Sequence, residues 1–361
     1  MQQLWSRFEY SLDLPMKELI NVGVFLTQSL QRSPTQLALT VPEGGDEDKL
    51  RLLPLDALSP LKFLAFVYPN EEDDPPFATP LATLCDPLYT NLACHCSTLW
   101  MEGYALALSE AHGLNLCDVL TRFTGVERFR VRNVTCLGIT QGDLSCLVSL
   151  TDIELRNVRD VPVLGLLSAT PSLKTLEMEN CAFEIAERPS IIDSCLQSLV
   201  LKDYLRGWLA KVGCRTLSHL TLSGQDPGKE GDFDFIQRTQ SIEEMHFGSM
   251  EPEDVRRLAV SASHIKDLTL SGDCHQLPRW VSETRSRLWF AQLRRLGIKS
   301  TCSCVTTAIE ELVRARCLPR THQESELVVG LEPLEHLSIE GSLAYSMATH
   351  ALFQRRHVFR S

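Results

Sequence analysis

The chain has 361 residues, with 35 Lys and Arg against 46 Asp and Glu, and a formal net charge of −11 at pH 7. This acidic balance argues against a nucleic-acid partner, which needs a basic binding face, and no apolar run reaches the roughly 20 residues that cross a bilayer. With 44% hydrophobic but only 7% aromatic residues, the composition favours many small, leucine-rich core layers over one large aromatic core.

Two further features indicate the cellular location. The N-terminal residues lack the charged-then-apolar order of a signal peptide. The chain has 13 cysteines, an odd number, and several, such as Cys181 and Cys195, fall where small apolar residues would pack. We therefore expect reduced, mostly buried thiols in a protein of the cytoplasm, the nucleus or both.

A nine-residue motif with apolar residues at positions one, four and six recurs from the start of the chain. In residues 1–125 its copies are irregular, and acidic segments at 42–48 and 70–76, which also contain Gly or Pro, predict exposed loop insertions. The copies in this segment begin at Trp5, Pro34, Leu61 and Cys96. Each copy predicts a strand over its positions three to seven.

The motif becomes regular in residues 126–301, where successive first positions between Val126 and Ile265 lie 21 to 25 residues apart. This spacing falls within the roughly 20–29-residue period of leucine-rich repeats. The copies begin at Val126, Leu150, Leu173, Leu196, Leu217, Ile242, Ile265 and Leu293. Apolar segments between them, at 163–167, 233–236 and 254–260, predict the crossover helices that parallel strands require.

The last segment, residues 302–361, holds a predicted inserted helix over 308–317, a final copy at Leu334 and a C-terminal cap. Because strand side chains alternate faces, positions four and six point into a core and positions three, five and seven point out. The pattern predicts an α/β fold, one continuous and irregular leucine-rich-repeat solenoid of about 12 to 13 repeats, with parallel strands on the concave face and helices or loops on the convex face. A two-layer α/β domain is the alternative. Position nine varies between copies, so we expect no asparagine ladder.

The outward positions form the candidate binding surface, basic near Val126 and acidic beyond it. Its residues are Arg128, Arg130, Arg132, Glu154, Arg156, Glu177, Glu179, Lys202, His219, Glu244 and His246. Since neighbouring strands lie about 4.8 Å apart, we expect Arg130 to pair with Glu154. Glu179 should lie between Arg156 and Lys202, whereas Glu154 and Glu177 form a like-charge contact. One interpretation is a solvated face whose ion pairs contribute little, and the other is a concave surface that recognises a protein partner.

Patterns for metal binding and catalysis are weak. Cys94-His95-Cys96 and Cys302-Ser303-Cys304 suggest zinc, but their spacing differs from that of two-residue-gap knuckles and no second pair of ligands follows. There is no Gly-x-Ser-x-Gly nucleophile elbow and no Gly-rich phosphate loop. We therefore expect a protein that is not an enzyme and that binds no metal and no cofactor.

Three segments resemble the leucine-rich-repeat region of fungal F-box proteins, especially the basidiomycete set. They are Leu4-Trp5-Ser6, residues 27–39, and Leu166-Leu167-Ser168-Ala169-Thr170-Pro171-Ser172-Leu173. The resemblance implies a protein-binding solenoid that recognises substrates for a cullin-based ubiquitin ligase. The F-box itself has no counterpart in the sequence, so a ligase adaptor is expected as a partner only if an F-box lies upstream. The alternative is a stand-alone scaffold or inhibitor with no ubiquitin link.

Overall fold

The chain divides into two compact units, Met1–Leu196 and Gln197–Ser361, and each is described by itself. The structure is a computed structural model. It describes residues 7–11, 36–40, 62–67, 96–102, 114–115, 123–133, 137–138, 147–158, 161–182, 191–203, 208–224, 230–248, 257–258, 261–271, 290, 292–299 and 335–340. The predicted acidic insertions, the predicted helix over 308–317 and most of the segment at 254–260 lie outside the described residues.

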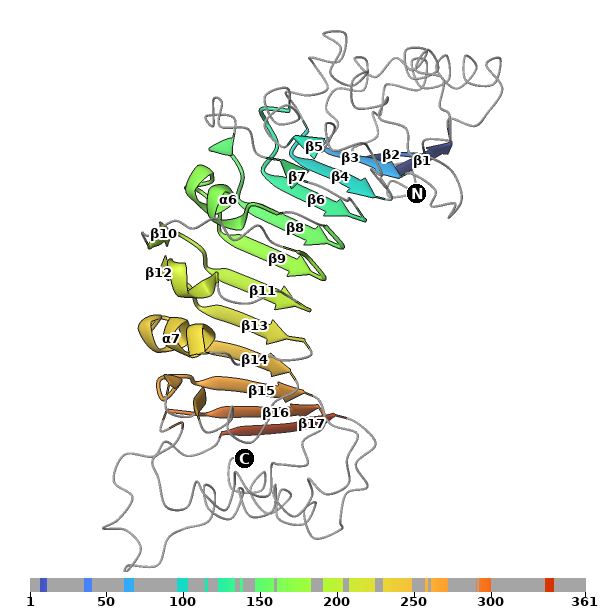
Figure 1. Cartoon of the computed structure of the whole chain (residues 1–361). Coiled ribbons are helices and arrows are strands. Elements are labelled where there is room, and N and C mark those ends of the chain that lie inside the picture. The colour runs from blue at the N-terminus through green and yellow to red at the C-terminus, as the bar shows by residue number, and fades with distance from the viewer. Residues whose placement is uncertain are drawn as a thin grey trace, which may run out of the picture. The chain divides into compact units, whose positions relative to one another are not determined.

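The first unit contains a parallel sheet in the order β1-β2-β3-β4-β6-β8-β9 (Figure 1). Its strands are β1 (Arg7–Ser11), β2 (Gln36–Thr40), β3 (Phe63–Val67), β4 (Thr98–Glu102), β6 (Arg128–Arg132), β8 (Asp152–Arg156) and β9 (Thr175–Glu179). The shorter strands of this unit are β5 (Leu114–Asn115) and β7 (Leu137–Gly138), which pair in parallel, and β10 (Ile192–Ser194). Each sheet strand covers positions three to seven of a predicted motif copy, including the four irregular copies, so these strand predictions are confirmed.

The second unit contains a parallel sheet in the order β11-β13-β14-β15-β16-β17 (Figure 1). Its strands are β11 (Ser198–Lys202), β13 (His219–Ser223), β14 (Glu244–Gly248), β15 (Asp267–Ser271), β16 (Arg295–Lys299) and β17 (His336–Glu340), and a short strand β12 (Val212–Cys214) lies outside this order. Equivalent motif positions pair across each boundary, as Leu220 does with Met245 and Met245 with Leu268. The sequence motif therefore sets the strand register as well as the strand positions.

The core lies on one face of each sheet, which we term the core face. From β4 to β16, every residue at motif positions four and six is at most 3% exposed, for example Leu176 and Leu220. Position one is buried in the same way, as at Leu173 and Leu217. A one-residue slip in register would move the charged outward residues into this core, so the apolar spacing fixes which face each side chain takes.

Two helices pack on the core side of the sheets (Figure 1). In the first unit, α6 (Val163–Ala169) buries five of its side chains, and Thr170 closes its C-terminal end through a 2.7 Å bond from Oγ1 to the Leu166 carbonyl. In the second unit, α7 (Glu230–Arg238) stacks Phe233 on Phe247 of β14, with ring centroids 6.5 Å apart. It also contacts the 3-10 helix η5 (Leu209–Lys211). The crossover predictions at 163–167 and 233–236 are confirmed, and the described part of the chain is α/β, with large parallel sheets and few helices.

Cysteine burial follows the prediction at one of the two named positions. Burial raises the pKa of the Cys181 thiol to about 11, although backbone hydrogen bonds with Val158 and Glu179 act to lower it. This thiol is therefore neutral and packs as a small apolar group. Cys195 is exposed, so its predicted burial is wrong. It directly precedes Leu196, which takes the inward direction at position one and leaves Cys195 on the solvent side.

Candidate functional site

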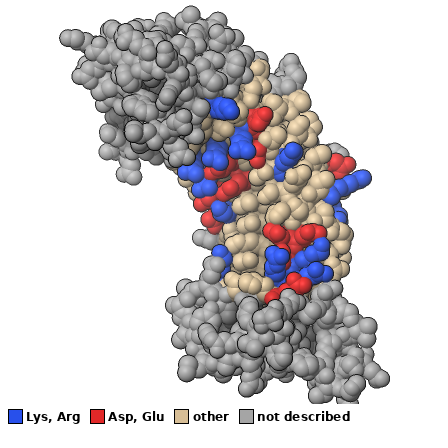
Figure 2. All heavy atoms as spheres, turned by 180° about the vertical axis from the view of Figure 1, so that it is seen from behind, with Lys and Arg blue, Asp and Glu red and all other residues tan. Residues whose placement is uncertain are grey.

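The outer face of each sheet, defined by motif positions three, five and seven, carries all eleven predicted site residues. The first unit holds Arg128, Arg130, Arg132, Glu154, Arg156, Glu177 and Glu179, and the second holds Lys202, His219, Glu244 and His246. All of them are exposed or half-buried. Figure 2 shows basic and acidic side chains interleaved over the described surface. A basic part and an acidic part were predicted. In the structure, side chains of opposite charge on neighbouring strands contact one another.

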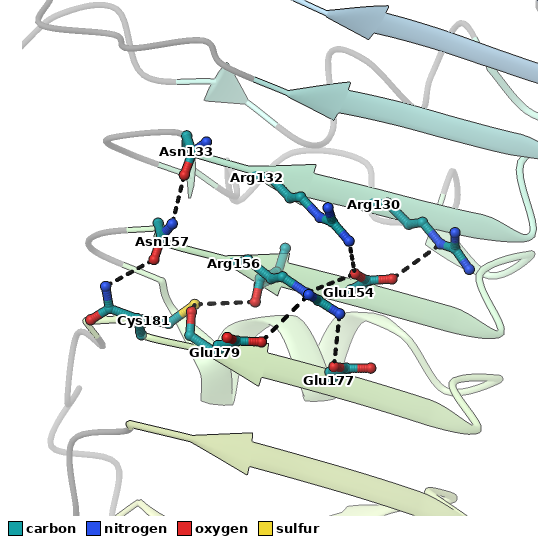
Figure 3. A network of polar contacts seen from close by, with 11 residues as sticks. Arg130, Arg132, Asn133, Glu154, Arg156, Asn157, Glu177, Glu179 and Cys181 are labelled. Carbon is teal, nitrogen blue, oxygen red and sulfur yellow. Dashed lines mark hydrogen bonds and ion pairs between the residues drawn. The ribbon is translucent and has the colours of Figure 1, made fainter. Parts of the chain in front are cut away.

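One carboxylate, Glu154 on β8, organises the charged surface of the first unit (Figure 3). Its Oε2 lies 3.2 Å from Arg130 Nε, and its Oε1 lies 3.1 Å from Arg132 Nη2. The same Oε1 lies 2.9 Å from Arg156 Nε. The Glu154 side chain is only 14% exposed, because three guanidinium groups cover it. The predicted Arg130–Glu154 pair is confirmed, whereas the sharing of this carboxylate by three arginines was not predicted.

Arg156 joins the carboxylates of β8 and β9. Its Nη2 lies 3.2 Å from Glu177 Oε1, and its Nη1 lies 3.6 Å from Glu179 Oε2. Glu154 and Glu177 are register partners, as predicted. The predicted like-charge neighbours are therefore present, and the contact of the Arg156 guanidinium with both carboxylates was not predicted. The predicted Arg156–Glu179 pair is confirmed, and the predicted pairing of Glu179 with Lys202 stays a prediction.

The sequence analysis missed two aromatic residues on the same outer face. Trp100 is the register partner of Arg130, at position five of β4. The Arg132 guanidinium lies over its ring, 5.0 Å from the centroid, and Phe63 of β3 meets the ring edge-on at 6.2 Å and 82°. Trp100 stands at an outward position of the irregular copy that begins at Cys96. The outward rows were predicted only from Val126 onward, so extending them upstream would have found it.

The second unit carries smaller outward side chains. His246 Nε2 lies 3.0 Å from Ser271 Oγ, and burial lowers the pKa of His246, with smaller contributions from Lys299 and Lys202. Two other predicted site residues, His219 and Glu244, form an exposed pair that was not predicted, with 3.1 Å between Nε2 and Oε2. At Gly248 an added Cβ would lie 2.8 Å from the Ser223 Cβ. The described part of this face is thus largely polar, and His246 is half-buried in it.

No family model matches the chain, and no curated protein matches it. Its functional interpretation therefore rests on the geometry of its own outer face.

Polar residues continue the outer face beyond the strand ends (Figure 3). Asn133, Asn157 and Asn180 occupy motif position eight, with φ of 57°, 53° and 50°. Asn157 Nδ2 donates to Asn133 Oδ1 at 2.6 Å, and Asn180 Nδ2 donates to Asn157 Oδ1 at 2.8 Å. The prediction that an asparagine ladder is missing concerned position nine, where Val158 and Cys181 lie, and this side-chain ladder was not predicted. The ladder stands at position eight, one residue before the position that the prediction considered.

The described residues give no support for metal or membrane chemistry. Among them, no group of three or more His, Cys, Asp and Glu side chains could hold a metal ion. Of the two suspected zinc motifs only Cys96 is described, and its Sγ donates to the Thr98 carbonyl at 3.1 Å. No helix in the described ranges is long and apolar enough to cross a membrane.

Proposed function

We propose that the chain is a non-catalytic leucine-rich-repeat solenoid of about 12 to 13 repeats that binds a protein partner on the outer, concave face of its sheet. The observation that carries the proposal is the network around Glu154, in which Arg130, Arg132 and Arg156 are held within 3.2 Å of one carboxylate. This network lies on the face opposite the core and α6. Its polar groups are already ordered before any partner arrives.

A pre-ordered charged network suits recognition better than a merely solvated face does. Fixing long side chains costs conformational entropy, and a surface that has fixed them beforehand loses less when it binds. Charges that alternate over three strands confer specificity, because a wrong partner meets like charges. With strands about 4.8 Å apart, β6, β8 and β9 present a flat charged area of about 10 Å across, which matches a protein surface better than a single small molecule.

We further propose that the partner is a substrate of an F-box-type ubiquitin ligase, for which this chain is the recognition part. The resemblance of residues 4–6, 27–39 and 166–173 to fungal F-box proteins supports this proposal. A stand-alone scaffold or inhibitor is the alternative. An in-frame F-box upstream of Met1 in the gene, together with co-purification of ligase adaptors, would favour the receptor; a partner without adaptors would favour the scaffold.

Site-specific photocrosslinking in the source organism tests the binding face. A photoreactive residue replaces Thr175 on the outer face of β9 or, in control chains, Val148 or Ile191, which are 49% and 57% exposed off the outer face. We expect discrete protein crosslinks from the Thr175 position and none from the control positions. Crosslinks of equal yield from all three positions, or from the controls alone, would overturn the proposed face.

A second arm of the experiment tests the network itself. Arg130→Gln and Arg132→Gln, combined, should lower the crosslink yield at Thr175 at least about tenfold, because they remove the donors that the partner meets. The matched control is Arg295→Gln on β16, which lies at the same motif position as Arg128. It should leave the yield unchanged, and circular dichroism should show equal folding of all variants.

A further inference from the structure

We propose that the first unit recognises an acidic peptide segment that also carries an apolar side chain, through a surface formed by Phe63, Trp100, Arg130 and Arg132. We term this set the aromatic–arginine surface. The inference rests on the proposed function and adds the chemistry of the partner. It is carried by three features of the outer face: its aromatic rings, its unpaired donors and its local charge.

The aromatic rings are unusual for their position. Nearly all large apolar side chains of the described strands lie on the core face, where they are buried. Phe63 and Trp100 instead lie at outward positions and are only half-buried, although they contact each other edge-on. Tryptophan and arginine are both among the residue types enriched at the energetic centres of protein interfaces. An apolar side chain of a partner would complete the burial of both rings.

Two hydrogen-bond donors in this surface have no acceptor in the described part of the chain. They are Trp100 Nε1 and Arg132 Nε, and both atoms are shielded from solvent where the guanidinium stacks on the ring. A shielded donor without an acceptor is unfavourable, and indole N–H groups in such positions normally have one. Arg132 is held by a carboxylate that it shares with two other arginines. A small shift of its side chain would let a partner carboxylate accept from both donors.

The local charge favours an acidic partner. Three arginines project from β6, and they contact two carboxylates, Asp152 and Glu154. The outward positions of β6 carry only arginine, although Glu102 of β4 is the register partner of Arg132. Strand β6 is therefore a local concentration of positive charge within a chain of net charge −11. A nucleic acid also offers anions and stacking bases, but the acidic chain as a whole repels a polyanion. A short acidic segment gains the local attraction with less long-range repulsion.

Fluorescence anisotropy with the full chain and defined probes tests the inference. The main probe is a labelled peptide of about twelve residues, with Asp and Glu around one Leu and one Phe. Matched probes replace the acids with Asn and Gln, replace the apolar residues with Ala, or are an oligothymidine of similar length. We expect the main peptide to bind at least about tenfold more tightly than each matched probe. Equal binding of the amide or Ala peptide, or tighter binding of the oligothymidine, would overturn the inference.

Variants locate the binding site. Trp100→Ala and Arg132→Gln should each weaken binding of the main peptide about tenfold. Trp100→Phe, which keeps a ring but lacks the N–H, should weaken it less than Trp100→Ala and serves as the test if Trp100→Ala does not fold. The control, Arg295→Gln, removes an arginine that pairs with Asp267 at 3.5 Å and is 62% exposed. It should change the affinity less than twofold. Binding that no unit-one variant alters would overturn the inference.

The two proposals fail in distinguishable ways. If the acidic peptide does not bind but Thr175 still crosslinks to a protein, the aromatic–arginine inference is wrong and the proposed binding face stands. If the crosslinks come only from the control positions, the proposed function is wrong regardless of the peptide result.

Discussion

The outer faces of the two units share a backbone pattern and differ in chemistry. On β6, β8 and β9 long charged side chains meet across strand boundaries, and Glu154 lies within 3.2 Å of three arginines. On β13, β14 and β15 four of the nine equivalent positions are Ser or Thr, and the other five are His219, Glu244, His246, Gly248 and Asp267. The core faces remain alike, with leucines such as Leu176 and Leu220 buried to the same degree. The inward positions thus determine the fold, while the outward positions are free to diverge in function.

The residues that follow the strands also share a backbone feature between the two units and differ in their side-chain contacts. Position eight has a positive φ at Asn133, Asn157, Asn180 and Asp203, and Gly224 follows in the next copy. Asn, Asp and Gly are the residues that adopt this backbone region at low cost. In the first unit the three asparagines also bond to one another. A backbone requirement common to both units therefore becomes an added side-chain network in one of them.

The largest effect is expected from removing the shared carboxylate charge. Glu154→Gln keeps the side-chain shape but leaves three half-buried guanidiniums without their common counter-charge. We expect the free energy of unfolding to fall by about 1–3 kcal/mol. The matched variant in the second unit is Glu244→Gln, whose side chain is 52% exposed and pairs with His219. This variant should lower the free energy of unfolding by less than about 0.5 kcal/mol.

Denaturant unfolding followed by circular dichroism measures both variants. Equal losses for Glu154→Gln and Glu244→Gln would mean that the charged network of the first unit adds no more stability than an exposed pair. The contrast between the two outer faces would then concern composition alone.

A smaller effect is expected at the strand ends. Asn157→Ala places at a φ of 53° a residue without the short polar side chain that lets asparagine adopt this region, and it removes both ladder bonds. It should therefore lower the free energy of unfolding by about 1–2 kcal/mol. Asn157→Gly tolerates this φ and loses only the bonds, so its cost should be about half as large. In the second unit, Asp203 has a φ of 49°. Asp203→Ala should lower the free energy of unfolding by about 1 kcal/mol, which is the backbone part of the loss expected for Asn157→Ala. If Asn157→Gly costs as much as Asn157→Ala, the backbone explanation is wrong.

Most of the fold could be predicted because the signal is repeated. An apolar residue at positions one, four and six recurs in copy after copy, and one buried face leaves a single register for each strand. Even the irregular copies at Trp5 and Pro34 give strands at the expected positions. The ladder was missed because Asn, Asp and Gly share a backbone property at position eight, and a search for one residue type at position nine could not detect it.

The candidate site was less predictable than the fold. Register alone showed that Arg130 faces Glu154, because this pair depends only on strand positions. Whether Arg132 and Arg156 turn toward the same carboxylate depends on rotamers of long side chains, which a motif does not encode. The contact of Arg156 with both Glu154 and Glu177 was not predicted for that reason. Trp100 was missed because the outward rows were predicted only from Val126 onward, although its motif position is outward like that of Arg130.

The smallest expected effect is a pH dependence in the second unit. Burial lowers the pKa of the His246 imidazole first, and Lys299 and Lys202 lower it further. Because the unfolded chain then takes up a proton at a higher pH than the folded chain, stability falls as the pH drops below about 6.5. Above that pH both states are neutral and the contribution vanishes. His246→Gln should therefore reduce the decline of the thermal midpoint between about pH 6.5 and 5, by roughly 2 °C given the partial exposure of the ring.

The second unit also contains His264, where burial again lowers the pKa and a backbone hydrogen bond involving Thr239 opposes the shift. Its effect on stability has the same sign as that of His246. His246→Gln should therefore leave part of the decline of the thermal midpoint at low pH, and adding His264→Gln should remove more of that decline. Thermal unfolding of the full chain across this pH range gives the comparison directly. A decline that steepens in His246→Gln would show that the protonated imidazole is favoured in the folded state. The His246–Ser271 contact would then not be a neutral pair. The contrast with the charged face of the first unit would not hold at this position.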